Sequence, residues 1–224
     1  MNWKLAIGAA AIALSAPFAA SAATVQANGV LVNIYQKSNT GNLTNTADAT
    51  LTNALAATYI GSVSFTGALH FDTDTSGANP PDTTTINQWL TSKGGSYTEL
   101  GGGFDENLTI SSEGIINDTA LTTWFEFLGV GQAFTFDVTH DDGFCFYDSG
   151  TTELCAPDPT SVAQTLGGNY SGGVFQLVYA ATNGDPSVLR VDGEGSLSAV
   201  PLPAGLPLLL AGIGGLALLR RRKS

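Results

Sequence analysis

The sequence predicts a mainly β protein, an antiparallel β-sandwich of jelly-roll type, with one apolar helix at each end. Three observations lead to this fold class. Residues 23–199 are rich in Thr, Ser, Gly and Asn, and short alternating apolar and polar runs recur in them between turn residues. These roughly 177 residues are enough for one domain with its own core. The long apolar runs stand outside them, near the two ends of the chain.

Residues 1–22 predict a secretory signal peptide with a single helix. Lys4 gives a positively charged start, and the apolar run Leu5–Leu14 follows it. Pro17 ends the helix, and Ala20-Ser21-Ala22 supplies the small residues of a cleavage site, so we expect the cut after Ala22. An uncleaved anchor is the alternative, although the apolar run is only about half a membrane span.

Alternating segments predict the strands of the body, and Gly-flanked polar segments predict what connects them. The predicted strands are 29–35, the pair Tyr59–Phe71, 108–116, 174–179 and 188–191, with Ile60, Val63, Phe65 and Leu69 as core residues of the pair. Residues 38–58 read as a loop. Asp82–Lys93 predicts a short helix that is capped by Asp82 or Thr83 and ended by Gly94-Gly95.

The most regular alternation predicts a β-hairpin in the middle of the body. Residues 124–128 form its first strand, a Gly-Val-Gly-Gln turn follows, and residues 133–140 form its second strand. On the second strand Phe134, Phe136 and Val138 share one face, while the residues between them are polar.

The two cysteines, Cys145 and Cys155, predict a disulfide in an exported protein. If the chain turns back through Ser149-Gly150-Thr151, residues whose numbers sum to 300 face each other, which places Cys145 opposite Cys155 and Phe146 opposite Leu154. Two free thiols, or a metal held by the pair, are the alternatives.

The body carries nineteen acidic residues and three basic ones (Lys37, Lys93 and Arg190), so its formal net charge is −16. Such a charge argues against nucleic acid and anionic membrane surfaces as partners. It permits cation binding, although most of these carboxylates are expected simply to be hydrated.

Residues 200–224 form a three-part tail. Val200-Pro201-Leu202-Pro203-Ala204 is a proline-stiffened peptide that cannot be helical. The apolar run 205–219 predicts a transmembrane helix of roughly 22 Å, which needs the preceding peptide and the snorkelling of arginines to cross a core of about 30 Å. Arg220, Arg221, Arg222 and Lys223 then form a basic cluster for the cytoplasmic side, which leaves the body outside.

This tail resembles the VPLPA form of the PEP-CTERM sorting signal of bacterial surface proteins. The resemblance implies that exosortase, a membrane-embedded processing enzyme, recognises residues 200–204 while the helix and the basic cluster hold the protein in the inner membrane. The body would then pass from the periplasm to the cell surface or the extracellular matrix. A plain C-terminal anchor is the alternative.

His140-Asp141-Asp142-Gly143 and the following residues to Gly150 resemble the Asp-Asp-Gly…Tyr…Gly core of the protective-antigen-like β-sandwich domain. Asp141, Asp142, Gly143, Tyr147 and Gly150 match that pattern, whereas Ser149 stands where the family has an Asp and the cysteine pair is an addition. Lectin members of that family bind calcium through the adjacent Asp pair, joined by a cis peptide, and the ion holds sugar hydroxyls. The run Phe175–Tyr179 resembles the family's penultimate strand.

Asp141 and Asp142 are therefore the candidate metal ligands, and calcium is the candidate cofactor, because hard oxygen ligands suit Ca²⁺. Their alternative role is a hydrated turn before Gly143. A second candidate is Asp72-Thr73-Asp74-Thr75-Ser76-Gly77, which opens like a calcium loop but has Thr83 at its twelfth position. An ordinary acidic loop is the alternative there.

No catalytic residue is predicted, because the chain has no G-x-S-x-G motif and neither His70 nor His140 has a helical metal-ligand partner. We expect a non-enzymatic surface or matrix protein, associated with exopolysaccharide. The alternatives are a calcium-dependent carbohydrate-binding module on the same tail and an exported hydrolase.

Overall fold

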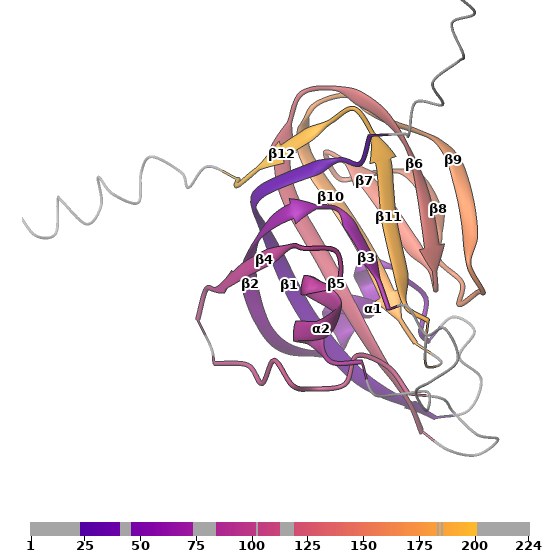
Figure 1. Ribbon diagram of the computed structural model, residues 1–224. Helices are drawn as coiled ribbons and strands as arrows, with labels where there is room; N and C mark the ends of the chain where they lie inside the picture. The colour runs from indigo at the N-terminus through magenta and orange to yellow at the C-terminus, as the bar shows by residue number, and fades with distance from the viewer. Residues whose placement is uncertain are drawn as a thin grey trace, which may run out of the picture.

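Two β-sheets packed face to face form the body, as the computed structural model shows (Figure 1). The structure describes residues 23–40, 46–73, 84–101, 103–112, 119–182, 184 and 186–200. The predicted mainly β, sandwich-like fold is confirmed. The helices predicted in 1–22 and 205–219 lie outside the described residues, and within those residues no helix is long and apolar enough to cross a membrane.

Within the described residues, the larger sheet has eight strands in the order β4-β2-β1-β12-β5-β10-β7-β8, and the smaller has four in the order β3-β11-β6-β9. The strands of the larger sheet are β1 (Gln26–Thr40), β2 (Thr58–Ala68), β4 (Ser96–Glu99), β5 (Thr119–Gly131), β7 (Phe144–Asp148), β8 (Thr151–Ala156), β10 (Gly173–Ala181) and β12 (Ser196–Ser198). Those of the smaller are β3 (His70–Asp72), β6 (Phe134–Asp141), β9 (Ala163–Tyr170) and β11 (Val188–Gly193). Neighbouring strands run antiparallel, except that β12 lies parallel to β1 while it pairs antiparallel with β5.

Aromatic side chains fill the space between the sheets. Trp89 lies at the centre of one group, with its ring centroid 4.4 Å from that of Phe71, 4.2 Å from that of Phe125 and 5.1 Å from that of Tyr179. Its indole N–H donates to the backbone oxygen of Ser187 at 3.0 Å, so the one polar atom of the ring is satisfied. The packing of these large rings holds the two sheets together. Each ring contributes stabilisation through its contacts with other rings in addition to the burial of its apolar area.

Trp89 belongs to the short helix α2 (Ile86–Thr91), which starts at a capping box. The Thr85 side chain accepts from the Gln88 backbone N–H at 3.2 Å, and the Gln88 side chain accepts from the Thr85 N–H at 2.9 Å. The prediction of a short helix here is confirmed, but the predicted cap at Asp82 or Thr83 is wrong. The cap is Thr85 and the helix begins at Ile86, because Thr85 and Gln88 have the spacing that a reciprocal cap needs.

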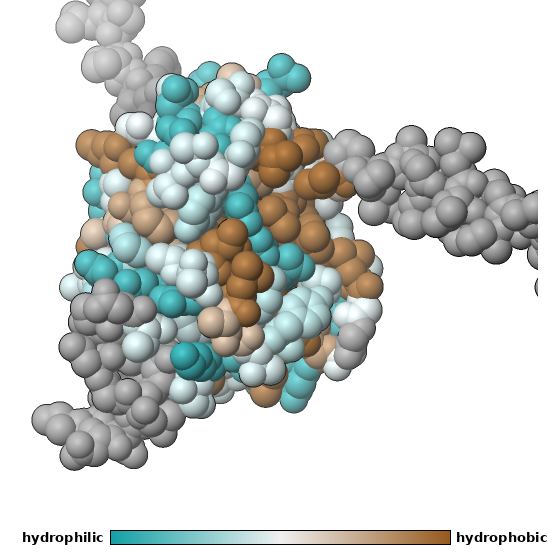
Figure 2. All heavy atoms as spheres, turned by 180° about the vertical axis from the view of Figure 1, so that it is seen from behind, coloured by the Kyte–Doolittle hydropathy of each residue, from teal (hydrophilic) through white to brown (hydrophobic). Residues whose placement is uncertain are grey.

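The outer face of the larger sheet is partly covered by a second short helix, α1 (Leu51–Ala56). Trp124 is fully buried beneath this region, and its indole N–H donates to the Asp48 backbone oxygen at 3.0 Å. The prediction of a loop over residues 38–58 is therefore wrong in part, since β1 extends to Thr40 and Leu51–Ala56 is helical. Figure 2, which shows the molecule from behind, has groups of apolar side chains separated by polar ones.

The strands predicted at 29–35, 174–179 and 188–191 are confirmed as parts of β1, β10 and β11. The predicted pair Tyr59–Phe71 is found as β2 and β3, which lie in different sheets; Val63, Phe65 and Leu69 are buried, whereas Ile60 is half-buried. For the strand predicted at 108–116, the described part up to Ser112 contains only an isolated bridge between Thr85 and Thr109.

The predicted hairpin at 124–140 is wrong. β5 pairs with β1, β10 and β12, whereas β6 pairs with β9 and β11, so the chain crosses from one sheet to the other after Gly131. A Cβ at Gly131 would lie 2.6 Å from the Ser196 backbone oxygen, because β12 occupies the place that a hairpin partner would take. The predicted buried face of β6 is nevertheless confirmed, since Phe134, Phe136 and Val138 all lie in the core.

Candidate metal centre

The adjacent carboxylates lie where the chain passes from the smaller sheet to the larger one. Asp141 is the last residue of β6, and after Asp142 and Gly143 the chain enters β7 at Phe144. The peptide bond between Asp141 and Asp142 is cis. This passage places both carboxylates at one end of the sandwich, beside the first residues of the loop that follows β8.

Both carboxylates are buried and receive hydrogen bonds from the backbone. Asp141 is 7% exposed and Asp142 is 3% exposed. The Thr182 N–H donates to Asp142 Oδ2 at 2.7 Å, and the Thr160 N–H also donates to the Asp142 carboxylate. The Val162 N–H donates to the carboxylate of Asp141. Two segments distant in sequence, the end of β10 and the loop after β8, thus hold the pair.

The backbone oxygens of the pair are also fixed, and they tie the site to the core. The Tyr179 hydroxyl, whose ring stacks on Trp89, donates to the Asp141 backbone oxygen. His140 Nδ1 lies 2.6 Å from the Asp142 backbone oxygen, and His140 Nε2 lies 3.0 Å from Thr165 Oγ1. Burial lowers the pKa of His140 and so favours the neutral ring. The Asp142 oxygen can only accept, so Nδ1 donates to it, and in the neutral ring Nε2 then accepts from the Thr165 hydroxyl.

Gly143 explains why the loop after β8 can approach so closely. A Cβ at this position would overlap the Pro157 backbone oxygen. The Gly143 oxygen accepts from the Ala180 N–H at 3.1 Å, and the Pro157 oxygen accepts from the Ala49 N–H at 2.9 Å. The glycine of the Asp-Asp-Gly motif thus permits the contact that brings the N–H groups of Thr160 and Val162 to the carboxylates.

Burial makes the two charges unfavourable in the protein alone. Burial raises the pKa of Asp141 to about 6, although the Val162 N–H acts against it. Burial, together with the charge of Asp141, raises the pKa of Asp142 to about 8 against the hydrogen bonds from Thr182 and Thr160. Within the described residues neither carboxylate forms an ion pair with Lys or Arg, and the adjoining imidazole is neutral. A bound cation would supply the missing positive charge.

The donor set suits a hard cation such as Ca²⁺, which takes carboxylate, carbonyl and water oxygens. It does not suit zinc, which prefers His and Cys ligands, because His140 uses both ring nitrogens elsewhere. In the part of the chain that the structure describes, no three residues of the types His, Cys, Asp and Glu gather into a metal-binding group. Further ligands would therefore have to be neutral oxygens or water.

The second candidate, the Asp72–Gly77 loop, is described only as far as Thr73. Asp72 Oδ2 lies 3.1 Å from Lys93 Nζ, which is a surface ion pair. Residues 74–77 lie outside the described residues. Asp72 is thus engaged with a lysine where it ends β3.

The disulfide between Cys145 and Cys155 is present, as predicted, and joins β7 to β8 with a Cα–Cα distance of 4.1 Å. The register is the predicted one, with Phe146 opposite Leu154, and it shifts by one residue before Tyr147. The Tyr147 hydroxyl accepts from the Leu51 N–H at 3.2 Å on the outer face of the larger sheet. Tyr147 and Gly150 are the other matching residues of the motif. Tyr147 therefore lies on β7 and Gly150 in the turn between β7 and β8, away from the two carboxylates.

Sequence reasoning missed the groups that hold the pair in place. Thr160, Val162 and Thr182 contribute backbone N–H groups, which leave no signature in residue type. His140 carries a signal in the sequence, since it stands directly before the pair, but that position does not reveal a structural role. Its role here is to hold the Asp142 backbone oxygen.

The fold and the site together define a two-sheet β-sandwich with a candidate cation site at one end. No family model and no curated protein matches the chain. Among solved structures, the chain is similar to the PA14 domain of an antifreeze protein, MpAFP, with a TM-score of 0.47 and 11% identity over 82% of this chain and 97% of that one. It is also similar to the PA14 sugar-binding domain of an RTX adhesin, with a TM-score of 0.46 and 13% identity over 77% and 90% of the two chains.

A third similar structure is a GH31 α-xylosidase from Xanthomonas citri. Its TM-score is 0.35 at 9% identity, and the match covers 81% of this chain but 15% of that enzyme.

Proposed function

We propose that this protein is an exported bacterial surface or extracellular-matrix protein, sorted by an exosortase through residues 200–224. In this proposal the tail anchors the protein in the inner membrane, with the body in the periplasm. After processing, the protein associates with the exopolysaccharide of the cell surface. Its role is binding and structure rather than catalysis.

The observation that carries this proposal is the place where the folded body ends. β12 ends at Ser198, and the Ala199 N–H makes a last backbone hydrogen bond, to the Asn28 oxygen at 3.2 Å. Val200, the first residue of the sorting motif, follows directly and is 41% exposed. A membrane enzyme could therefore reach a motif that begins at this exposed residue without unfolding the β-sandwich, whose last strand ends at Ser198.

The tail proposal is tested by changing the motif and the charges separately in the native host. Changing Pro201 and Pro203 to Ala should leave the protein anchored but unprocessed, because the peptide can then join the helix and bury its backbone. Replacing residues 220–223 with neutral residues should instead weaken membrane retention and orientation. Cell fractionation with immunoblotting separates the two results.

Pro207→Ala is the matched control, since it removes a proline just outside the motif and should leave processing intact. Mass spectrometry of the mature protein gives the decisive result. A mature chain that still carries Arg222, in a host with an intact exosortase, contradicts the proposal and leaves a plain anchor.

Calcium-dependent carbohydrate binding is the second candidate function, and the two buried carboxylates without a described counter-charge favour it. The position of the pair also suits a binding site. β6 starts beside the β12 end of the sandwich and ends at Asp141, so the pair lies at the end away from Val200 (Figure 1). At about 3.4 Å per residue, the eight residues of β6 separate the two ends by roughly 25 Å.

This second candidate predicts that Ca²⁺ raises the melting temperature of the full-length protein in detergent, because the ion binds the native state. Replacing Asp141 and Asp142 with Asn should abolish the rise. Glu153→Gln with Asp158→Asn is the control, since it removes two charges from exposed positions and should retain the rise. A glycan array with and without EDTA then tests the sugar. An unchanged melting curve at millimolar Ca²⁺ eliminates both the ion site and the lectin function.

A further inference from the structure

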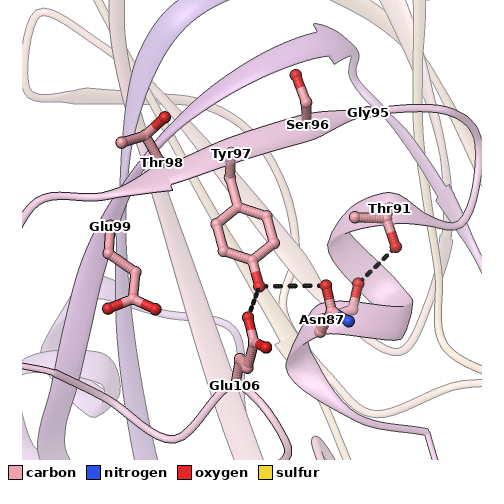
Figure 3. A pocket seen from close by; sticks show the side chains of 8 residues that line it. All are labelled: Asn87, Thr91, Gly95, Ser96, Tyr97, Thr98, Glu99 and Glu106. Atoms are coloured by element: carbon pink, nitrogen blue, oxygen red, sulfur yellow. Dashed lines mark hydrogen bonds between the residues drawn. The ribbon is translucent and has the colours of Figure 1, made fainter.

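A hollow of about 550 Å³ lies at the far edge of the larger sheet, on a part of the molecule that the carboxylate pair does not use (Figure 3). Its walls come from α2, from β4 and from the segment that contains Glu106. The side chains that matter for its chemistry are Asn87, Thr91, Tyr97, Glu99 and Glu106. Its volume is in the range of small-molecule sites.

The fold brings these side chains together from three segments. Tyr97 and Glu99 are two residues apart on β4, so they lie on one face of the strand. The opposite wall is fixed to the start of α2 by two backbone hydrogen bonds, from Ile86 N–H to the Leu108 oxygen and from Asn87 N–H to the Glu106 oxygen, both at 3.0 Å. Glu106 is thereby held in front of Tyr97.

The phenol of Tyr97 connects the two walls. Its hydroxyl donates to Glu106 Oε2 and lies 3.1 Å from Asn87 Oδ1, as the dashed lines in Figure 3 show. Burial, the hydrogen bond to Glu106 and the charges of Glu106 and Glu99 raise the pKa of Tyr97, so the group remains a protonated donor. The ring itself is half-buried and packs against the core.

The charged side chains that line the hollow are all acidic. Glu99 and Glu106 are both in its lining, which contains no Lys or Arg. Lys93, the basic residue nearest in sequence, lies 3.1 Å from Asp72 in an ion pair and is not part of the lining. Glu99 is exposed, and its side chain makes no hydrogen bond or ion pair with another described residue, so it is available to a ligand.

We propose that this hollow binds an amino sugar, a saccharide unit that carries a primary ammonium group. The two carboxylates match the ammonium, and charge-assisted hydrogen bonds of this kind are stronger than neutral ones. The Asn87 amide matches a sugar hydroxyl, and the Thr91 hydroxyl, which donates to the Asn87 backbone oxygen at 2.7 Å, can accept from another. The phenol supplies an apolar surface and attracts a cation at its face.

The site is independent of the carboxylate pair at Asp141 and of the sorting tail. The test is therefore run in EDTA, on the full-length protein in detergent, by isothermal titration calorimetry. The probes are a tetrasaccharide of glucosamine and the same tetrasaccharide fully N-acetylated, in which each ammonium group is replaced by a neutral acetamide. The glucosamine tetrasaccharide should bind at least about tenfold more tightly, because acetylation removes the ammonium.

Variants identify the groups that bind. Glu99→Gln and Glu106→Gln should each weaken binding of the glucosamine tetrasaccharide about fivefold, and Tyr97→Ala should weaken it for both probes. Glu153→Gln and Glu194→Gln are matched controls, since they make the same charge change at exposed positions elsewhere and should leave binding unchanged. Glu99→Gln alters only an exposed side chain, so the test survives if Glu106→Gln disturbs folding.

Equal affinity for the two tetrasaccharides overturns the proposal, and so does an absence of binding at millimolar concentration. Equal weakening by the control variants would show attraction to the overall negative charge of the body, and it overturns the site as well.

Discussion

A side chain at position 143 would occupy the space that the loop after β8 fills. Gly143→Ala should lower the free energy of unfolding by about 3 kcal/mol, because the new Cβ meets the Pro157 carbonyl oxygen, which is part of the backbone. The same displacement would take the N–H groups of Thr160 and Val162 away from the carboxylates. The variant should therefore also lose any stabilisation by Ca²⁺, measured as the shift in melting temperature.

Gly150→Ala is the matched control for that change. Gly150 has a φ of +88° and open space around its Cβ position, so alanine there should cost about 1–2 kcal/mol through the backbone alone. Its calcium response should equal that of the unchanged protein. Equal losses of calcium response in the two variants would contradict the role given to Gly143.

His70 gives the folded protein a pH dependence. Burial first, then the charges of Lys93 and Arg190, lowers the pKa of His70 below its ordinary 6.5, although Asp72 and Asp192 act against them. The unfolded chain therefore binds a proton more readily, so stability is full above the ordinary pKa and is lost as pH falls through the folded-state value. His70→Gln should show a smaller loss of unfolding free energy than the unchanged protein between about pH 7.5 and about pH 5.

Urea denaturation at the two pH values measures this difference. If both proteins lose the same unfolding free energy between the two pH values, His70 titrates alike in the folded and unfolded chains.

At the scale of single elements, α2 depends on its cap more than a longer helix would. It has six residues, and its Trp89 lies at the centre of the aromatic core. Thr85→Ala should lower the free energy of unfolding by about 1 kcal/mol, because the Gln88 N–H loses its acceptor. Thr85→Ser keeps the oxygen and should lose much less, as chemical denaturation can measure. A Ser variant as unstable as the Ala variant would show that the methyl group, and not the cap, matters.

Local sequence patterns predicted the positions of the strands better than they predicted which strands pair with each other. The pairing of Cys145 with Cys155 followed from one short turn and two cysteines, whereas the register shift before Tyr147 had no signal in the sequence. The pairing of β5 and β6 could not be obtained in this way. Phe125 and Phe134 face one core from two different sheets, so their periodicity is the same as in a hairpin. What separates the strands is β12, which arrives from the other end of the chain.

The candidate site likewise has residues that the local sequence predicts and contacts that only the fold determines. Asp141, Asp142 and Gly143 were predicted from their own sequence. The hydrogen bonds that hold them come from Thr160, Val162 and Thr182, and these positions are set only by folding, since any residue type except proline can donate from its backbone. Helix α1 was missed for a related reason. Its six residues include only one buried side chain, Ala54, too few to make an amphipathic pattern.

At the scale of the whole molecule, the net charge of −16 on the body should make its stability depend on salt. Raising NaCl from about 20 mM to about 0.3 M screens the repulsion among surface carboxylates. We expect the melting temperature to rise by roughly 2–4 °C, the shift that about 1 kcal/mol produces in a domain of this size. Asp141→Asn with Asp142→Asn should keep this rise while losing the response to Ca²⁺. A salt response that vanishes in that variant would show that the two effects have one origin.

If the proposed tail tethers the protein to the membrane, the position of β12 has a mechanical consequence. A pull on Val200 would reach the body first at Ser196–Ser198, which bonds to β1 on one side and β5 on the other. Three residues resist little in shear, so this strand would detach before anything else. Behind it, β1 and β5 already pair with each other from Leu31 to Thr40, and that contact would stay closed. Under load, β12 would unpair first and add its residues to the linker between the membrane and the body. The pairing of β1 with β5 would keep the rest of the sandwich folded.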